Sequence, residues 1–145
     1  MHYRLLDEHD GRRTYAVALQ IGESVMSTLT ALARELSLVG SSVAGIGGFQ
    51  SATLGYFDWE RTNFIENRVD EQVELLSFQG NIAEGEGGEP KIHAHVVLGR
   101  SDATTRGGHL VEAIVRPTME LIITESPEHL HRAHDSATGL VLLKP

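Results

Sequence analysis

Large apolar residues occupy every second position from Thr14 to Ile21, and this alternation is typical of a half-buried β-strand. From Ser24 to Leu38 the apolar residues recur at helical spacing instead, which predicts an amphipathic α-helix. Ser24 is a suitable N-cap for this helix, and Gly40 is a suitable residue to end it. The chain is therefore expected to begin its regular structure with a strand followed by a helix.

The middle of the chain carries β-like patterns that are broken by glycines and polar residues. The segment from Ser42 to Asp58 is apolar and glycine-punctuated, and we interpret it as two short strands or one long bent strand. A polar connection from Glu60 to Asp70 precedes a further strand from Gln72 to Gln79. The run from Glu84 to Pro90 contains three glycines and three glutamates, so we expect a flexible acidic loop there.

Three more strands are predicted, at Lys91 to Leu98, at Thr118 to Thr124 and at Leu140 to Leu143. Six to seven strands that mostly follow one another, with one main helix, predict an α+β fold with a largely antiparallel sheet. At 145 residues the chain is expected to be a single domain, residues 1–145, with its core at about 13–126 and its final strand at about 139–144.

Composition and charge narrow the classes of function. No apolar run approaches the roughly 18 residues of a membrane span, and the first residues lack the apolar segment of a signal peptide, so we expect a cytoplasmic protein without a membrane partner. The formal net charge of −8 disfavours DNA as a partner, because nonspecific binding depends on Lys and Arg neutralising phosphates. The chain has no cysteine, so a transition metal would need histidine, carboxylate or backbone oxygen ligands.

Three histidines have the spacing of a metal site. His93 and His95 lie at positions i and i+2 of a predicted strand, so both imidazoles leave the same face. His109 follows Gly107 and Gly108, and it could complete a three-nitrogen site that leaves one position open to water. Zinc is the expected divalent metal, with nickel, cobalt, copper and iron as alternatives. The competing interpretation is that these histidines are ordinary surface or interface residues.

Two carboxylates are candidates for a catalytic role beside such a metal. Glu74 and Glu120 both lie within apolar runs of predicted strands, where either could orient a histidine or transfer a proton. The alternative for each is a solvent-facing or interface position on a strand whose other face is core. A second histidine tract is interpreted as a surface turn or helix, and it consists of His129, His131 and His134.

Four blocks of sequence together resemble the plant and prokaryote conserved (PPC) domain. They are Gly45 to Gly48 (GIGG), Val73 to Ile82 (VELLSFQGNI), Ile92 to Val96 (IHAHV) and Gly107 to Leu110 (GGHL). The resemblance extends from about Arg13 to Ser126. It implies an α+β domain that assembles as a homotrimer and, as in some stand-alone prokaryotic members, metal binding at the positions of His93, His95 and His109.

The resemblance leaves three functions open. The first is a metal-binding homotrimer whose chemistry on a small molecule would be hydrolysis or hydration. The second is a DNA-associated or regulatory oligomerisation module without catalysis. In plants the domain is joined to AT-hook segments that bind AT-rich DNA, but this chain has no Arg-Gly-Arg-Pro hook. The third is an interaction module whose histidines pack at a subunit interface.

Overall fold

The computed structural model describes residues 1–144, which form one α-helix and nine β-strands of a single sheet. Pro145, the last residue of the predicted domain, lies outside the described residues. Every strand pair is antiparallel except β5 with β8, so the predicted α+β fold with a largely antiparallel sheet is confirmed. The elements are β1 (His2–His9), β2 (Arg12–Gln20), α1 (Val25–Leu36), β3 (Gly40–Asp58), β4 (Asn63–Val69), β5 (Val73–Glu84), β6 (Pro90–Gly99), β7 (Thr105–Glu125), β8 (His131–His134) and β9 (Val141–Lys144).

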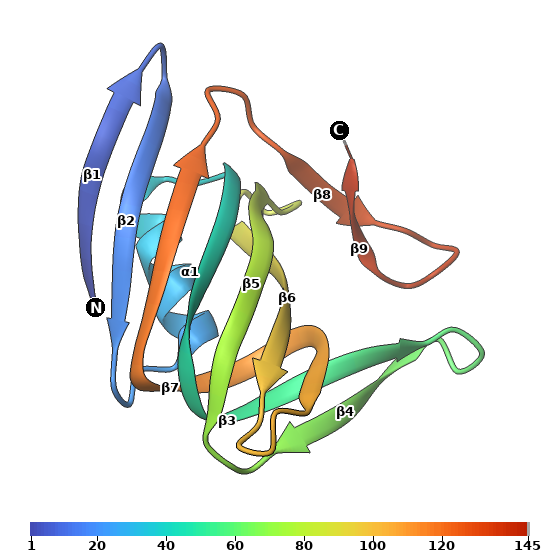
Figure 1. Ribbon diagram of the computed structural model, residues 1–145. Coiled ribbons are helices and arrows are strands. Elements are labelled where there is room, and N and C mark those ends of the chain that lie inside the picture. Colours follow the sequence, from blue (N-terminus) through green and yellow to red (C-terminus); the bar gives the residue numbers. More distant parts are fainter. Residues whose placement is uncertain (145) are drawn as a thin grey trace.

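Four strands of the sheet pair in a closed circuit. Strand β3 pairs with β5, β5 with β6, β6 with β7, and β7 with β3. The circuit closes because β3 and β7 are long and bent, so the two halves of each strand face different neighbours (Figure 1). Strands β1 and β2 extend the sheet beyond β7, and β8 and β9 form a hairpin joined to β5 by one bridged pair, Glu84 with His131.

The hydrophobic core lies between α1 and the sheet. Leu29 and Leu32 of the helix are fully buried together with Phe49 of β3, Phe78 of β5 and Leu110 of β7. Their burial removes large apolar surfaces from water, which is the main favourable contribution to folding. With 12 residues the helix is too short to cross a membrane, and the part of the chain that the structure describes contains no other helix.

The helix begins and ends through contacts that differ from the prediction. Ser24 occupies the predicted N-cap position, but its side chain makes no capping hydrogen bond. The carboxylate of Glu112, on β7, instead accepts hydrogen bonds from the Met26 backbone N–H at 3.1 Å and from the Ser24 hydroxyl at 2.7 Å. At the other end, Ser37 adopts the left-handed conformation with φ of 53°. The predicted stop at Gly40 is therefore wrong, and Gly40 is the first residue of β3.

Strand boundaries differ most from the prediction where the side chains are polar. Residues 42–58 lie in one long strand with a register shift between Gly45 and Gly47, which confirms the bent-strand alternative. The polar connection predicted from Glu60 to Asp70 is wrong in its second half, because β4 pairs with β3 there although all its residues except Val69 are exposed. The predicted surface turn or helix at residues 129–134 is also wrong, because residues 131–134 form strand β8.

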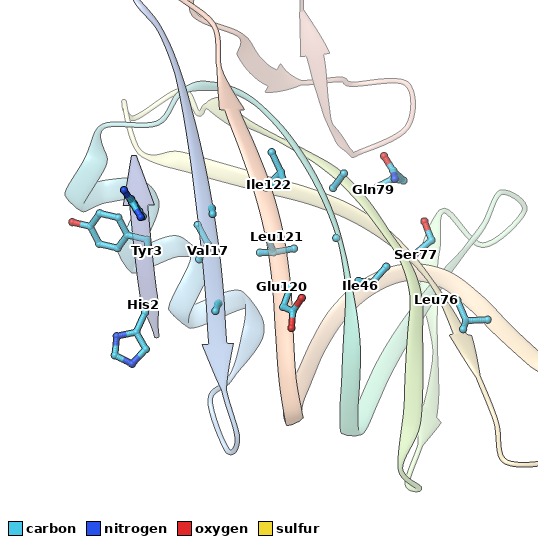
Figure 2. A pocket seen from close by; sticks show the side chains of 15 residues that line it. His2, Tyr3, Val17, Ile46, Leu76, Ser77, Gln79, Glu120, Leu121 and Ile122 are labelled. Atoms are coloured by element: carbon cyan, nitrogen blue, oxygen red, sulfur yellow. The ribbon is translucent and has the colours of Figure 1, made fainter. Parts of the chain in front are cut away.

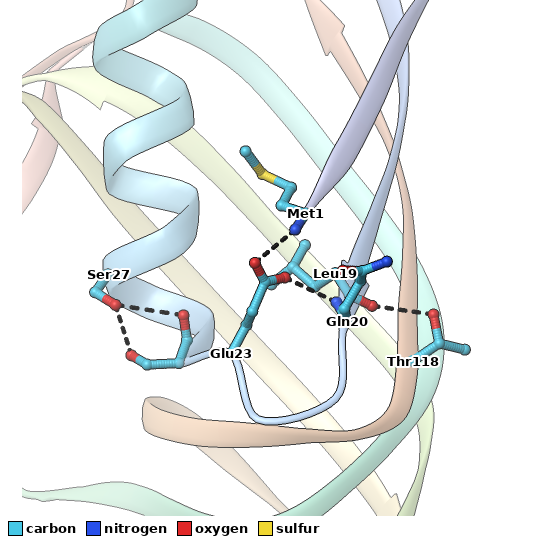
Figure 3. A network of polar contacts seen from close by, with 7 residues as sticks. Met1, Leu19, Gln20, Glu23, Ser27 and Thr118 are labelled. Carbon is cyan, nitrogen blue, oxygen red and sulfur yellow. Dashed lines mark hydrogen bonds and ion pairs between the residues drawn. The ribbon is translucent and has the colours of Figure 1, made fainter.

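The first residues form strand β1, which the sequence pattern did not predict, and polar contacts hold its beginning. The Met1 ammonium group donates a hydrogen bond to Oε1 of Glu23 at 2.5 Å, and the Gln20 backbone N–H donates to Oε2 of the same carboxylate at 2.8 Å (Figure 3). The hydroxyl of Thr118 donates to the Leu19 carbonyl at 3.0 Å. Glu23 thus links the start of β1 to the turn between β2 and α1.

Candidate metal centre

Strands β6 and β7 bring the three predicted histidines together. His95 on β6 and His109 on β7 are direct partners across the antiparallel ladder. His93 lies two residues before His95, so its side chain leaves the same face of the strand. One nitrogen of each imidazole lies within 4.8 Å of a nitrogen of each of the others. Tetrahedral coordination with Zn–N bonds of about 2.0–2.1 Å requires the three nitrogens to lie closer together than this bound, so the side chains would have to turn towards a bound ion.

The surroundings keep two of these imidazoles unprotonated. Burial, the positive charge of Arg132 and electrostatic interactions with the neighbouring imidazoles of His109 and His95 lower the pKa of His93 from 6.5 to about 4. Burial also lowers the pKa of His109, with further contributions from His95 and Arg132. A metal ligand must present an unprotonated nitrogen, so both residues are ready to bind an ion near neutral pH. A set of three imidazole ligands fits zinc, nickel, cobalt or copper.

Arg132, on β8, is a site residue that the sequence analysis missed. Its side chain donates hydrogen bonds to the Val141 carbonyl at 3.0 Å and to Oδ1 of Asn81 at 2.8 Å, and its Nη2 lies 3.2 Å from Nδ1 of His93. The residue is only 7% exposed, and its Nε–H has no hydrogen-bond partner. In the sequence Arg132 stands between His131 and His134, and such a polar pattern is equally typical of a solvated surface segment, so it did not mark Arg132 as a site residue.

A small pocket of about 240 Å³ opens beside two of the histidines, His93 and His109. The ring of Phe64, from β4, forms part of its wall, with its centroid 5.2 Å from that of His109. Among the described residues, no aspartate or glutamate lines this pocket. The other lining residues are Lys91, Ile92, Arg132, Leu140, Val141 and Leu142. The pocket is therefore largely apolar with two cationic side chains.

The two predicted carboxylates lie away from this pocket. Glu120 lines a different and broader groove of about 740 Å³, which crosses the sheet (Figure 2). Glu74 is exposed on β5, where it pairs with Gly48 of β3 and Gly99 of β6. Within residues 1–144, neither carboxylate makes a hydrogen bond or an ion pair with a histidine of the triad. Their catalytic role stays a prediction.

Gly80, on β5, has no side chain that would clash with β6 where β6 carries His93 and His95. Gly80 pairs with Ala94, the residue between His93 and His95. A Cβ atom at Gly80 would lie 2.7 Å from the His93 carbonyl oxygen, which is closer than Cβ atoms approach oxygen in real structures. A larger residue at this position would therefore displace the strand that carries two of the three histidines.

Comparison with known proteins relates this chain to one protein family. The family model described as the Plants and Prokaryotes Conserved (PCC) domain matches residues 6–127. No curated protein matches the chain.

Solved structures are similar to this chain over nearly its whole length. A plant- and prokaryote-conserved (PPC) protein from Pyrococcus horikoshii has a TM-score of 0.85 and 28% identity, with 99% of this chain and 95% of that chain covered. A metal-containing protein from Archaeoglobus fulgidus has a TM-score of 0.84 and 28% identity, with 99% and 97% covered. A candidate DNA-binding protein from Ralstonia eutropha JMP134 has a TM-score of 0.83 and 32% identity, with 90% of each chain covered.

Proposed function

Since this chain belongs to the Plants and Prokaryotes Conserved domain family, we propose that it binds one divalent metal ion per protomer through His93, His95 and His109. The observation that carries the proposal is the convergence of one nitrogen from each of these side chains within 4.8 Å. The metal-containing relative from Archaeoglobus fulgidus supports it. We propose zinc as the ion, because three imidazoles without a thiolate form a common zinc ligand set.

The proposed reaction class is hydrolysis or hydration of a small molecule in the pocket beside His93 and His109. Zinc supplies Lewis acidity in such sites and lowers the pKa of a bound water towards 7. The chain itself keeps His93 and His109 neutral and shields one side of the site with apolar residues. Glu74 and Glu120 do not line this pocket, so their predicted proton transfer is not part of this proposal, and pH–rate profiles of their Gln variants would test it separately.

Metal content tests the metal site directly. Protein purified without a metal-affinity step is loaded with zinc, dialysed and analysed, and we expect about one ion per chain. His93→Ala, His95→Ala and His109→Ala should each weaken zinc binding by more than about 100-fold, because each removes a direct ligand. His9→Ala is the control, since His9 is exposed and lies outside the cluster. A protein that takes up neither zinc, nickel nor cobalt would contradict the proposal.

We also propose that protomers assemble as homotrimers through the groove shown in Figure 2. Ile46, Leu76 and Ile122, from β3, β5 and β7, are 57%, 51% and 47% exposed and lie along this groove. Along β7, the buried Leu121 and Ile123 alternate with exposed residues that face the groove. Large apolar side chains gathered on one exposed sheet face are typical of a protein–protein interface, which supports assembly on this surface.

A DNA-associated or regulatory role without catalysis is the second candidate function. The observation in its favour is the relative from Ralstonia eutropha, which is described as a candidate DNA-binding protein. The formal net charge of −8 argues against it. A gel-shift titration with duplex DNA at about 0.15 M salt separates the two candidates. Tight, salt-sensitive binding that survives in His109→Ala would favour the DNA role over the metal-dependent one.

A further inference from the structure

The pocket beside the histidines contains a buried positive charge that the described residues do not neutralise. Arg132 is 7% exposed, and its hydrogen-bond partners are the Val141 carbonyl, the Asn81 side-chain oxygen and a ring nitrogen of His93. None of these groups is an anion, and no carboxylate of residues 1–144 forms an ion pair with this guanidinium. A buried ion without a counter-charge is unfavourable, so the site favours an anion that comes from elsewhere.

The guanidinium of Arg132 also has an unused donor on the edge that suits a carboxylate. Nε and Nη2 form one side of the arginine fork, and this side binds both oxygens of a carboxylate through parallel hydrogen bonds. Nε–H is buried and has no partner, whereas Nη2 contacts only neutral acceptors. One edge of the fork is therefore incompletely satisfied within the part of the chain that the structure describes.

A metal ion bound to His93 would remove one hydrogen-bond acceptor from the Nε–Nη2 edge of Arg132. A neutral imidazole has one unprotonated nitrogen, and that nitrogen cannot accept a hydrogen bond from Arg132 while it binds a metal. If the metal takes the opposite nitrogen, Nδ1 carries the proton and again cannot accept. In either case Arg132 loses an acceptor and gains a positively charged neighbour. An anion between them would restore the hydrogen bond and reduce the repulsion.

The rest of the pocket indicates which kind of anion fits. At about 240 Å³ it lies below the range of about 300–1,000 Å³ that is typical of drug-sized ligands. Ile92, Leu140 and Leu142 provide an apolar wall. Lys91 is a second cation of the lining, although it pairs with Glu89 at 2.9 Å. The pocket thus offers an apolar surface for a short aliphatic chain and a cationic end for its charge.

We infer that this pocket binds a small carboxylate with a short apolar tail, whose charged group interacts with both Arg132 and a metal ion at the three histidines. The tail packs against β9 and Ile92. The inference rests on the proposed metal site and deepens it, because it names the chemical class of the ligand and a residue, Arg132, that selects for it.

Butyrate is the probe for this inference. Zinc-loaded protein is titrated calorimetrically with butyrate in a buffer free of carboxylate and phosphate, and with butyramide, a neutral molecule of nearly the same shape. We expect saturable binding of butyrate, at least about tenfold weaker binding of butyramide, and about tenfold weaker binding of acetate, which lacks two methylene groups. Butyrate should also change the visible spectrum of the cobalt-loaded protein, which reports directly on the metal site.

Substitutions of Arg132 test whether this side chain contributes to butyrate binding. Arg132→Gln should weaken butyrate binding by about 10-fold to 100-fold, the usual effect of losing a charge-assisted hydrogen bond, without lowering zinc content. Arg132→Lys keeps the buried charge without the fork, so it tests the same contact should the Gln variant fail to fold, and it should bind butyrate more weakly than the wild type. Arg12→Gln, an exposed position on β2, should bind butyrate like the wild type.

The outcomes separate this inference from the metal proposal. Zinc binding without butyrate binding, or unchanged butyrate affinity in Arg132→Gln, would overturn the carboxylate site and leave the metal site standing. Failure to bind zinc, nickel and cobalt would overturn the metal proposal and, with it, this inference. Zinc binding that tightens in Arg132→Gln with no response to butyrate would identify Arg132 as a competitor of the metal rather than a ligand contact, and this would also overturn the inference.

Discussion

His93 differs from the other two histidines of the cluster because Arg132 reaches it from β8. Burial and this neighbouring charge lower its pKa to about 4 in the folded chain, against about 6.5 when unfolded. Between these two values the unfolded state binds more protons than the folded state. The free energy of unfolding of the metal-free protein is therefore expected to fall as the pH is lowered from about 6.5 to about 4, and His93 adds nothing further below that range.

His93→Gln should remove this part of the pH dependence. Over that pH window, the wild-type protein is expected to lose about 1–3 kcal/mol more stability than the variant, because solvent screens part of the effect at a half-buried side chain. Urea unfolding of the metal-free proteins at several pH values measures the difference. His9→Gln should behave like the wild type, because its side chain is exposed. Parallel curves for wild type and His93→Gln would contradict the expectation.

At the scale of single residues, the sequence predicted the histidines but not their surroundings. The pairing of His93 and His95 follows from the two-residue period of a strand, which is a local property. His109 was proposed as the third ligand from its place after Gly107 and Gly108, and the resemblance to the PPC domain pointed to the same residue. Arg132 contacts His93 across 39 positions of sequence, and its burial depends on where the β8–β9 hairpin packs. No local pattern carries that information.

At the scale of elements, α1 depends on a strand that is remote in sequence. The first turn of the helix contains no acidic residue, and Glu112 of β7 supplies the negative charge that its free N–H groups favour. Glu112→Ala should lower the free energy of unfolding by about 1–2 kcal/mol, as measured by urea denaturation. Glu66→Ala, at an exposed position on β4, should change it by less than about 0.5 kcal/mol. Equal stabilities of the two variants would show that this carboxylate does not stabilise the helix.

The spacing of β5 and β6 can be tested at Gly80. Gly80→Ala introduces a Cβ that would contact the His93 carbonyl, so β6 must shift and zinc binding should weaken by about tenfold or more. In Gly87→Ala the new Cβ meets only the flexible end of the Glu89 side chain, and zinc binding should not change. Calorimetric zinc titration of both variants compares them directly. Wild-type affinity in Gly80→Ala would mean that the histidines adapt to the displaced strand.

Two of the strands that the sequence did not predict, β1 and β4, have side chains that face solvent at nearly every position. Strand β4 is exposed at every position except Val69, and β1 is exposed throughout, so neither shows the alternation that marks a half-buried strand. The first half of β7 contains Gly107 and Gly108, which are usually associated with turns. By contrast, α1 and β2 have one buried face each, and their periodicity predicted them correctly.

At the scale of the whole molecule, the exposed groove predicts how assembly can be disrupted. Ile122→Glu places a charge in the middle of the proposed trimer interface, where burial of an unpaired carboxylate is strongly unfavourable. Sedimentation equilibrium should show the wild type as a trimer and this variant mainly as a monomer. Ile21→Glu makes the same substitution at a side chain that is 65% exposed and outside the groove, so it should leave the mass unchanged. An unchanged mass for Ile122→Glu would exclude this face as the interface.

The pocket lies between the closed circuit of β3, β5, β6 and β7 and the β8–β9 hairpin, and these two walls differ in how many strand pairings hold them. The histidines lie on β6 and β7, which are paired on both sides, whereas Arg132 and Val141 lie on a hairpin joined to β5 by one bridged pair. In amide hydrogen exchange, we expect β8 and β9 to exchange through local opening and β6 to exchange only on global unfolding. We therefore expect small molecules to enter the pocket through local opening of the β8–β9 hairpin, while strands β6 and β7 keep the metal ligands in a constant arrangement.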